Sequence, residues 1–312
     1  MQLYKDRSFS AMFQDTFSFL KLNGKHFFKH FFVVNGIFIL LLLVIGYFFM
    51  KLYTQFIFGS FGNNSVNVMD EFMNENGLLF AFLAILFVVV ALISGVISYA
   101  YTPIYLQLYE KNGTTNFSSR SIIAAYKEHL GRLIVFLGSI VVLFVPVVIV
   151  VFIFMFVLVI TIVGIMFTPL LIGGIMLIFT MALMEYLEAK KGIWECYGYS
   201  WTLLSSKFWA AIGSVGIFYF MAYLVQNIPS ILIYFIGIIN MFTDFNNGTL
   251  DTVDVRDSMT VLLLAMFVIS FLLGVVLNVI VQLNQAVIFY SLKEGKENIK
   301  TKSIIDEIGT GV

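Results

Sequence analysis

The stretch LIVFLGSIVVLFVPVVIVVFIFMFVLVITIVGIMFTPLLIGGIMLIFTMALM, residues 133–184, contains no charged side chain. A helix crosses the hydrocarbon core of a bilayer with about 20 apolar residues, so this stretch is far too long for a single span. Gly164 and Pro169 interrupt it, and both residue types favour turns over continuous helix. We therefore expect two membrane-spanning helices joined by a tight, uncharged turn near Thr161–Pro169.

Four further uncharged runs are each long enough to hold a span: Phe31–Met50, Gly77–Tyr109, Phe208–Met241 and Ser258–Leu292. The run Phe208–Met241 is long, but Gln226, Asn227 and Pro229 interrupt it. We expect one span to about Asn227, followed by a short apolar segment lying against the outer membrane surface. The sequence thus predicts six membrane-spanning helices.

The composition also indicates a membrane protein. Hydrophobic residues make up 60% of the 312 residues and charged residues 12%, about half the charged fraction of an ordinary soluble domain. The net charge is zero, so bulk charge gives no reason to expect a nucleic-acid partner. The single cysteine, Cys196, cannot form an internal disulfide and lies in no Cys/His grouping, and we expect neither a metal nor a cofactor.

The distribution of basic residues predicts the orientation of the chain. Sixteen of the eighteen Lys and Arg residues precede the first span, follow the last, or lie after the second and fourth spans. The opposite loops contain only Lys51 and Arg256, together with seven acidic residues. Because cytoplasmic segments are enriched in Lys and Arg, we expect a multi-pass protein of the inner (cytoplasmic) membrane with both termini in the cytoplasm.

The cytoplasmic segments share one layout: a short amphipathic stretch, a small or polar break, a basic residue and then a span. Arg132 and Lys207 are each followed six residues later by Gly-Ser, which aligns two of these segments. We expect an all-α polytopic helix bundle, a single integral membrane domain over residues 1–312. An interfacial helix plus two spans would then occur three times, at about 8–113, 114–192 and 193–295, followed by a cytoplasmic tail at 296–312.

The amphipathic stretches permit two arrangements. Each is typical of a helix in the headgroup plane with its apolar face toward the acyl chains. The same apolar faces can instead pack on the inner ends of the bundle, and both arrangements can hold together. The apolar sets are Phe9, Met12, Phe13, Phe17 and Leu20 in the first stretch, Ile122, Ile123, Tyr126 and Leu130 in the second, and Trp194, Tyr197, Trp201 and Leu204 in the third.

The segment Gly192–Trp209, GIWECYGYSWTLLSSKFW, contains Ser200-Trp201 and ends in Phe208-Trp209. It resembles a segment of a group of bacterial membrane domains that includes the membrane domain of some glycerophosphodiester phosphodiesterases and related polytopic families. The end of the last span, Phe289–Glu294, resembles the corresponding exit in that group. The resemblance implies a six-helix membrane unit, often without an activity of its own. In the phosphodiesterases a separate soluble barrel carries the chemistry, so no catalytic residue is carried over to this chain.

On the last predicted span, Gly274, Asn278, Gln282 and Gln285 are spaced so that they fall within an arc of about 80°. Three amides on one face of a membrane helix would be costly unless they meet protein or water. They form either a hydrogen-bonded seam between helices or the wall of a polar cavity open to the cytoplasm or inner leaflet. We do not expect Gln226 as a partner, because the fifth span should place it near the opposite interface.

Basic residues at the cytoplasmic entrances are candidate contacts for anionic lipid headgroups. His26 and His30 have a spacing that suits metal ligands, but they alternate with lysines and no carboxylate or cysteine lies near them in sequence. We expect a headgroup-facing cluster there rather than a metal site. The candidate contacts are Lys25, His26, Lys29, His30, Arg132 and Lys207. The mid-span pair Gly173-Gly174 should ease helix packing.

These features favour a protein without enzymatic activity. The sequence contains no nucleotide-binding, zinc-hydrolase or serine-hydrolase motif. No acid or base lies deep in a predicted span, which argues against ion-coupled transport. The leading interpretation is a non-catalytic subunit or scaffold that contacts membrane lipids and assembles with other membrane protein subunits. The alternative is a protein that binds or moves a lipid or other amphiphile through a cytoplasm-facing polar cavity.

The predicted orientation is tested with reporter fusions. Reporters placed after Asn112, Gly192 and Val312 should be active in the cytoplasm, because those segments carry the excess of Lys and Arg. Reporters after Asn76 and Thr249 should be active only outside. An outside reading at the C-terminus would contradict the six-span topology.

Overall fold

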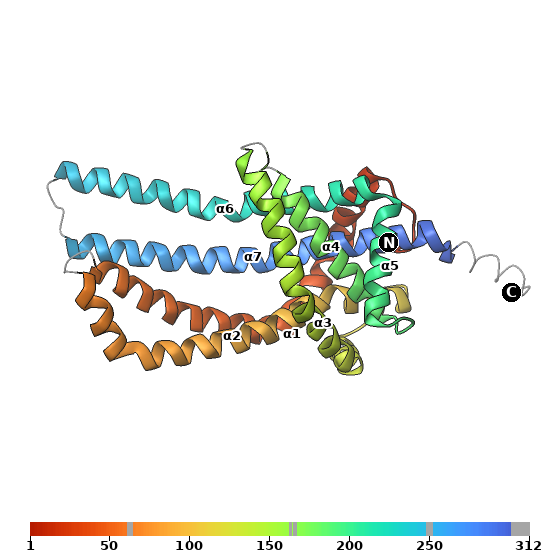
Figure 1. Ribbon diagram of the computed structural model, residues 1–312, viewed down its shortest axis with the longest axis horizontal. Coiled ribbons are helices and arrows are strands. Elements are labelled where there is room, and N and C mark those ends of the chain that lie inside the picture. Colours follow the sequence, from red (N-terminus) through yellow and green to blue (C-terminus); the bar gives the residue numbers. More distant parts are fainter. Residues whose placement is uncertain (61–64, 162–163, 165–166, 248–251, 301–312) are drawn as a thin grey trace, which may run out of the picture. The chain divides into compact units, whose positions relative to one another are not determined.

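The computed structural model covers the whole chain and contains seven α-helices within the described residues (Figure 1). It describes the backbone at residues 1–60, 65–161, 164, 167–247 and 252–300, and the side chains of these residues outside 55–73, 159, 233 and 240–259. Residues 301–312 of the predicted tail therefore lie outside the described part. The helices are α1 (Phe9–Ser60), α2 (Ser65–Asn112), α3 (Ser119–Ile160), α4 (Thr168–Leu187), α5 (Ile193–Ser206), α6 (Phe208–Asn247) and α7 (Thr252–Glu297).

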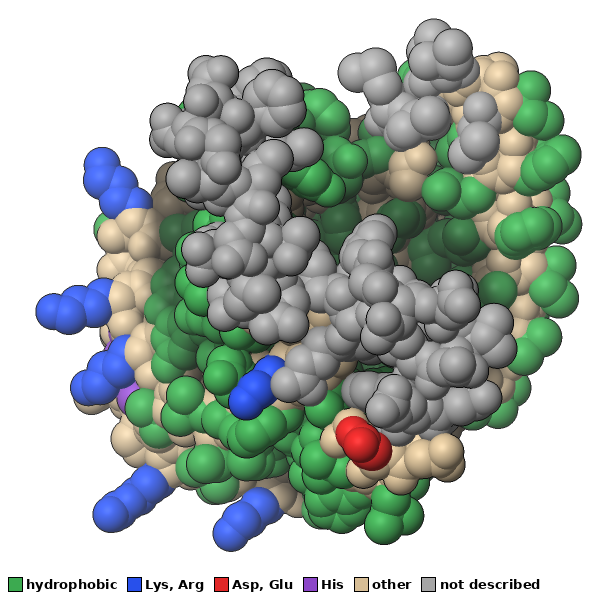
Figure 2. Space-filling model, turned by 90° about the vertical axis from the view of Figure 1, so that its left-hand side faces the viewer, with side chains coloured by type: hydrophobic (Ala, Val, Ile, Leu, Met, Phe, Trp, Pro, Cys, Tyr) green, Lys and Arg blue, Asp and Glu red, His purple; other side chains and the backbone are tan. Residues whose placement is uncertain are grey.

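Six of these helices are long and apolar enough to cross a membrane, by their length and composition. The exception is α5, which is 14 residues long. Hydrophobic side chains accordingly make up most of the described surface that faces the viewer in Figure 2. The predicted all-α polytopic fold is confirmed, and the chain is a multi-pass integral membrane protein.

The turn expected between the third and fourth spans is present. Helix α3 ends at Ile160, and α4 begins at Thr168 with a proline in its first turn. The Gly164 N–H donates a hydrogen bond to the Thr161 carbonyl at 2.7 Å. A Cβ atom at Gly164 would lie 2.3 Å from the carbonyl oxygen of Leu158, so this tight turn requires glycine.

The expected interruption of the fifth span was wrong, because α6 is one helix from Phe208 to Asn247. The side chains of Gln226 and Asn227 find hydrogen-bond acceptors while the backbone of α6 stays helical. The Asn227 side chain donates to the Tyr223 carbonyl one turn earlier, at 2.7 Å. The Gln226 side chain donates to the Ser270 carbonyl on α7 at 3.0 Å. Pro229 is accommodated inside the helix, as prolines often are in membrane helices when neighbouring groups compensate for the missing N–H.

Only the third predicted interfacial stretch forms a separate helix, α5. The first two stretches run without a helical break into the following span, so α1 is already helical at Phe9 and α3 at Ser119. Neither stretch contains a proline, and a continuous helix pairs its backbone groups internally, as a membrane requires. After α5 the backbone of Lys207 leaves the helical region (φ −140°, ψ 50°), which separates α5 from α6.

The first stretch packs partly on protein. Met12, Thr16 and Phe19 are buried, whereas Phe9 and Phe17 remain exposed. The buried residues lie three to four positions apart and therefore share one face of α1. The arrangement with apolar faces on the ends of neighbouring helices thus applies to part of this stretch, and an exposed apolar remainder is left.

Residue packing divides the chain into two compact units. Unit 1 comprises Met1–Val34, Val96–Ala222 and Asn278–Val312, and unit 2 comprises Asn35–Gly95 and Tyr223–Leu277. Both units draw on α1, α2, α6 and α7, so neither is a contiguous stretch of sequence. The predicted single domain and three-fold repeat remain predictions.

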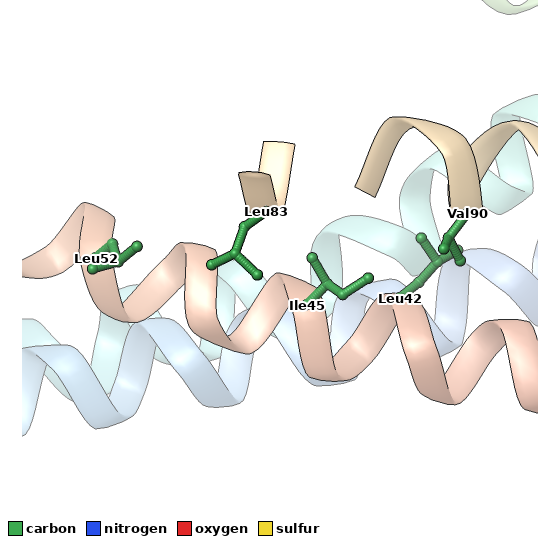
Figure 3. Close-up of a cluster of buried hydrophobic side chains, with 5 residues drawn as sticks. All are labelled: Leu42, Ile45, Leu52, Leu83 and Val90. Atoms are coloured by element: carbon green, nitrogen blue, oxygen red, sulfur yellow. The ribbon is translucent and has the colours of Figure 1, made fainter. Parts of the chain in front are cut away.

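Unit 2 has an aliphatic core (Figure 3). Leu42, Ile45 and Leu52 of α1 meet Leu83 and Val90 of α2, and partly buried phenylalanines pack around them. Helix α1 also approaches α7 closely in this unit. A Cβ atom at Gly46 would lie 2.2 Å from the ring of Phe267. Close approach through glycine is a common way for membrane helices to gain contact.

Glycines also bring α4 and α6 together in unit 1. A Cβ atom at Gly174 would lie 2.6 Å from Ile212, and one at Gly216 would lie 2.8 Å from Leu170. Gly173 faces Tyr219 of α6 in the same way. The prediction that Gly173-Gly174 eases helix packing is confirmed.

Candidate functional site

The cytoplasmic half of α7, as predicted from the basic residues, is buried on all sides in unit 1. Every residue from Val281 to Glu294 is buried, so this half of the helix has no exposed face. The run includes polar and charged side chains as well as apolar ones. Because a polar group buried away from water must find a partner, this segment is where hydrogen bonds and ion pairs to other parts of unit 1 are expected.

Two of the predicted amides bond to neighbouring helices. The Thr102 hydroxyl of α2 approaches Gln282 Oε1 at 3.4 Å. The Thr180 hydroxyl of α4 donates to Gln285 Oε1 at 2.7 Å and lies 2.9 Å from the hydroxyl of Tyr99. These contacts connect α7 to α2 and α4 through side chains, which is the geometry of a seam.

A third amide, Asn284, was not among the predicted site residues. Its Nδ2 donates to the hydroxyls of Thr16 on α1, at 3.1 Å, and Ser214 on α6, at 3.2 Å. Asn284 lies off the arc of the predicted stripe, so a search for one polar face missed it. In a helix buried on every side, polar residues do not need to share a face.

The outer members of the predicted stripe behave differently. Asn278 is exposed, and its Oδ1 lies 3.4 Å from Gln282 Nε2 one turn away. Gly274 lies against the Gln226 side chain, since a Cβ atom there would be 2.9 Å from Gln226 Nε2. Gln226 thus lies beside the glycine of the stripe, but its amide donates to the Ser270 carbonyl rather than to one of the three amides.

A cluster of ionic side chains joins the ends of α4 and α7. Lys293 Nζ lies 2.6 Å from Glu185 Oε2 and 2.7 Å from Glu188 Oε1. Glu185 also accepts from Lys191 at 2.7 Å. Lys293 and Glu185 are each 1% exposed, so this is a buried pair with an outer ring of partly exposed charges. Each buried charge has an oppositely charged partner, as burial requires.

Helix α5 closes one side of this ionic cluster. Lys191 Nζ lies 3.3 Å from the centre of the Tyr199 ring, in a cation–π contact. Burial and a hydrogen bond to Glu297 raise the pKa of the Tyr199 hydroxyl. Burial also raises the pKa of the Cys196 thiol to about 11, so this thiol stays protonated at neutral pH. A protonated, buried thiol is a poor nucleophile.

The N-terminal segment packs on α7 next to this cluster. Arg7 is fully buried, and its guanidinium donates to Asp15 at 2.8 Å and to the carbonyls of Gln2, Leu3 and Lys5. The Arg7 backbone N–H donates to Ser291 Oγ at 2.9 Å. One guanidinium therefore folds the first residues back over the end of α7.

The two histidines contact protein, and their predicted role as headgroup contacts remains a prediction. His26 bonds through one ring nitrogen to the Tyr105 hydroxyl, at 2.8 Å, and through the other to the Phe117 carbonyl, at 3.1 Å. His30 bonds to Ser119 Oγ at 2.6 Å. The rings face the segment that begins α3, because the helical spacing of α1 separates them from the lysines.

The other candidate headgroup contacts divide into two groups. Arg132 donates to the Leu187 carbonyl at the end of α4, at 3.1 Å, and Lys207 forms an ion pair with Asp6. These two cations therefore have protein partners. Lys25 and Lys29 are exposed on α1. Their contact with anionic headgroups remains a prediction.

No group of three potential metal-ligating residues occurs within the described part of the chain. Comparison with models of known protein families, with curated protein sequences and with solved structures gave no match. The resemblance to bacterial membrane domains therefore remains an expectation from the sequence.

The buried pair yields a prediction. Lys293→Met should destabilise the protein in detergent by on the order of 3 kcal/mol, because it removes the cationic partner of a buried pair and leaves the Glu185 carboxylate incompletely neutralised. The double variant Glu185→Met/Lys293→Met should recover most of that loss. Thermal unfolding of the wild type and the variants measures both effects.

The matched control is Lys190→Met, which removes a largely exposed lysine 3.4 Å from Glu188. It should cost less than about 1 kcal/mol, the usual range for a surface pair. If the double variant loses as much stability as Lys293→Met and Glu185→Met together, Glu185 and Lys293 are not energetically coupled.

Proposed function

We propose that this chain is a non-catalytic subunit or scaffold of a membrane protein assembly in a bacterial inner membrane. The observation that supports this proposal is the pairing of polar side chains along the buried half of α7. Gln282, Asn284 and Gln285 are engaged with hydroxyls of other helices, and Lys293 is engaged with carboxylates. Their hydrogen bonds are used to hold helices together, which is the chemistry of a rigid framework.

A surface for a partner is available on α3. Beyond Ile140 its less exposed side chains recur every three to four positions and form one seam, whereas the rest of the circumference is exposed and apolar. Membrane helices gain little hydrophobic energy from association, so partner choice depends on shape and close packing. Because α3 uses one seam for its own fold, the rest of its circumference remains available to a second protein. The seam residues are Leu143, Val147, Val151, Met155 and Leu158.

The proposal is tested by photo-crosslinking in cells. A benzophenone amino acid at Phe152, which is 71% exposed, should give a discrete protein adduct, because its side chain points away from the seam. The same amino acid at Val151, within the seam, should give no adduct with another protein. Discrete adducts from neither Phe152 nor Phe144, with no stoichiometric partner after purification in mild detergent, would refute the subunit role.

The alternative function, binding of a lipid or other amphiphile through a polar cavity, has one observation in its favour. Asn284 Oδ1 and Gln285 Nε2 are buried and lack a hydrogen-bond partner among the described residues. A bound hydroxyl or headgroup could supply one. The two atoms lie on neighbouring residues of α7 and would mark the position of the ligand.

The two functions predict different outcomes for Gln282→Leu. In a seam, the change removes an inter-helix hydrogen bond worth about 0.6 kcal/mol on average, so melting in detergent should fall slightly while lipid occupancy stays unchanged. This is the outcome we expect, and Asn278→Leu, which removes the acceptor of Gln282 Nε2, should give the same pattern. Loss of a specific lipid in native mass spectrometry at unchanged melting temperature would favour the cavity.

A further inference from the structure

Helix α5 has three faces that differ in burial and in residue type. At about 100° per residue, its side chains fall into sets roughly 120° apart. The first set, Cys196, Ser200, Leu203 and Leu204, is buried against protein. The second contains Trp194 and Trp201, each 56% exposed. The third is an exposed polar flank of Glu195, Thr202 and Ser206.

The covalent connections of α5 hold it at a membrane boundary. It follows the span α4 after five residues and precedes the span α6 after one. A helix tied so closely to two spans cannot move far from the level at which they leave the bilayer. Its start is fixed by Glu195, whose carboxylate accepts the Gly192 N–H at 3.0 Å.

We propose that the tryptophan face of α5 inserts into the boundary between lipid headgroups and acyl chains, and so sets the depth of unit 1 in the membrane. Tryptophan prefers this boundary because its ring is largely apolar while its N–H needs a polar partner. A helix lying there beside a bundle needs one face toward protein, one toward lipid and one toward water. The three sets on α5 meet that requirement.

The start of α6 carries a further exposed tryptophan close to α5 in the sequence. Trp209, its second residue, is 80% exposed. The chain contains three tryptophans in all, and the three are Trp194, Trp201 and Trp209. Helix α5 itself contains no Lys or Arg. The flanking Lys190, Lys191 and Lys207 each pair with a carboxylate, so we attribute insertion to aromatic burial rather than to attraction to anionic lipid.

Because all three tryptophans lie on α5 or at the start of α6, the intrinsic fluorescence of the native protein reports on this region directly. The purified full chain is reconstituted in phosphatidylcholine vesicles containing lipids brominated near the headgroup end or near the middle of the acyl chain. Shallow bromines should quench most, deep bromines less, and aqueous iodide least. Adding phosphatidylglycerol should leave this order unchanged.

A matched control uses the polar flank. In a background with all three tryptophans changed to phenylalanine, Thr202→Trp should be quenched by iodide and hardly by brominated lipid. Variants that retain a single native tryptophan should each repeat the wild-type order.

Four results would overturn the proposal. Strong iodide quenching of the native protein would place the face in water. Stronger quenching by deep than by shallow bromines would place it in the hydrocarbon core. Protection from every quencher would mean that protein covers it. Dependence of lipid quenching on phosphatidylglycerol would make charge, rather than aromatic burial, the driving force.

Discussion

A helix that is buried on every side depends on its neighbours for the partners of its polar side chains, and α7 is such a helix between Val281 and Glu294. Each amide there has a hydroxyl partner on a different helix: Gln282 on α2, Asn284 on α1 and α6, and Gln285 on α4. These partners fix which helices surround α7 and at which level. Apolar contacts alone would specify this less sharply, because lipid tails are as apolar as leucine.

The ionic cluster adds an orientation at the end of the bundle. A buried ion pair contributes little net stability, since desolvation offsets the attraction. A buried charge whose partner is displaced, however, strongly destabilises the fold. Lys293 between Glu185 and Glu188 therefore favours one register of α7 against α4. Arg7 acts in the same way on the N-terminal segment, because its buried guanidinium needs Asp15 and three backbone carbonyls together.

Sequence patterns predicted the helical class, the six apolar helices and the turn at Gly164, because these follow from local composition and from steric limits on single residues. They did not predict that α6 continues through Pro229, since the compensating contact of Gln226 comes from α7. The burial of Gln282 and Gln285 could be inferred from their common face. The burial of Asn284 could not be inferred in this way, because Asn284 points to another pair of helices.

The pairing of Glu185 and Lys293 did leave a signal in the sequence. They are opposite charges at the same level of two spans that end on one predicted side. Their pairing still requires knowing that α4 and α7 are neighbours. The protein contacts of the histidines could not be inferred for the same reason, since Tyr105 and Ser119 are far from them in sequence.

The distribution of these contacts makes α3 the least constrained of the spans in unit 1. The N-terminal half of α3 is fixed by polar contacts. Ser119 contacts His30, Arg132 contacts the end of α4, and Ser139 contacts Tyr197 of α5. Beyond Ile140 the described side chains show only the apolar seam, with a weak contact between Met155 and Thr168. In lipid, such a seam has no hydrophobic advantage over acyl chains and depends on close packing alone. Another helix with well-fitting side chains could therefore pack beside this half of α3 without disturbing the paired polar residues of α7. The framework would stay intact while its edge accepts a partner, and a scaffold needs both properties.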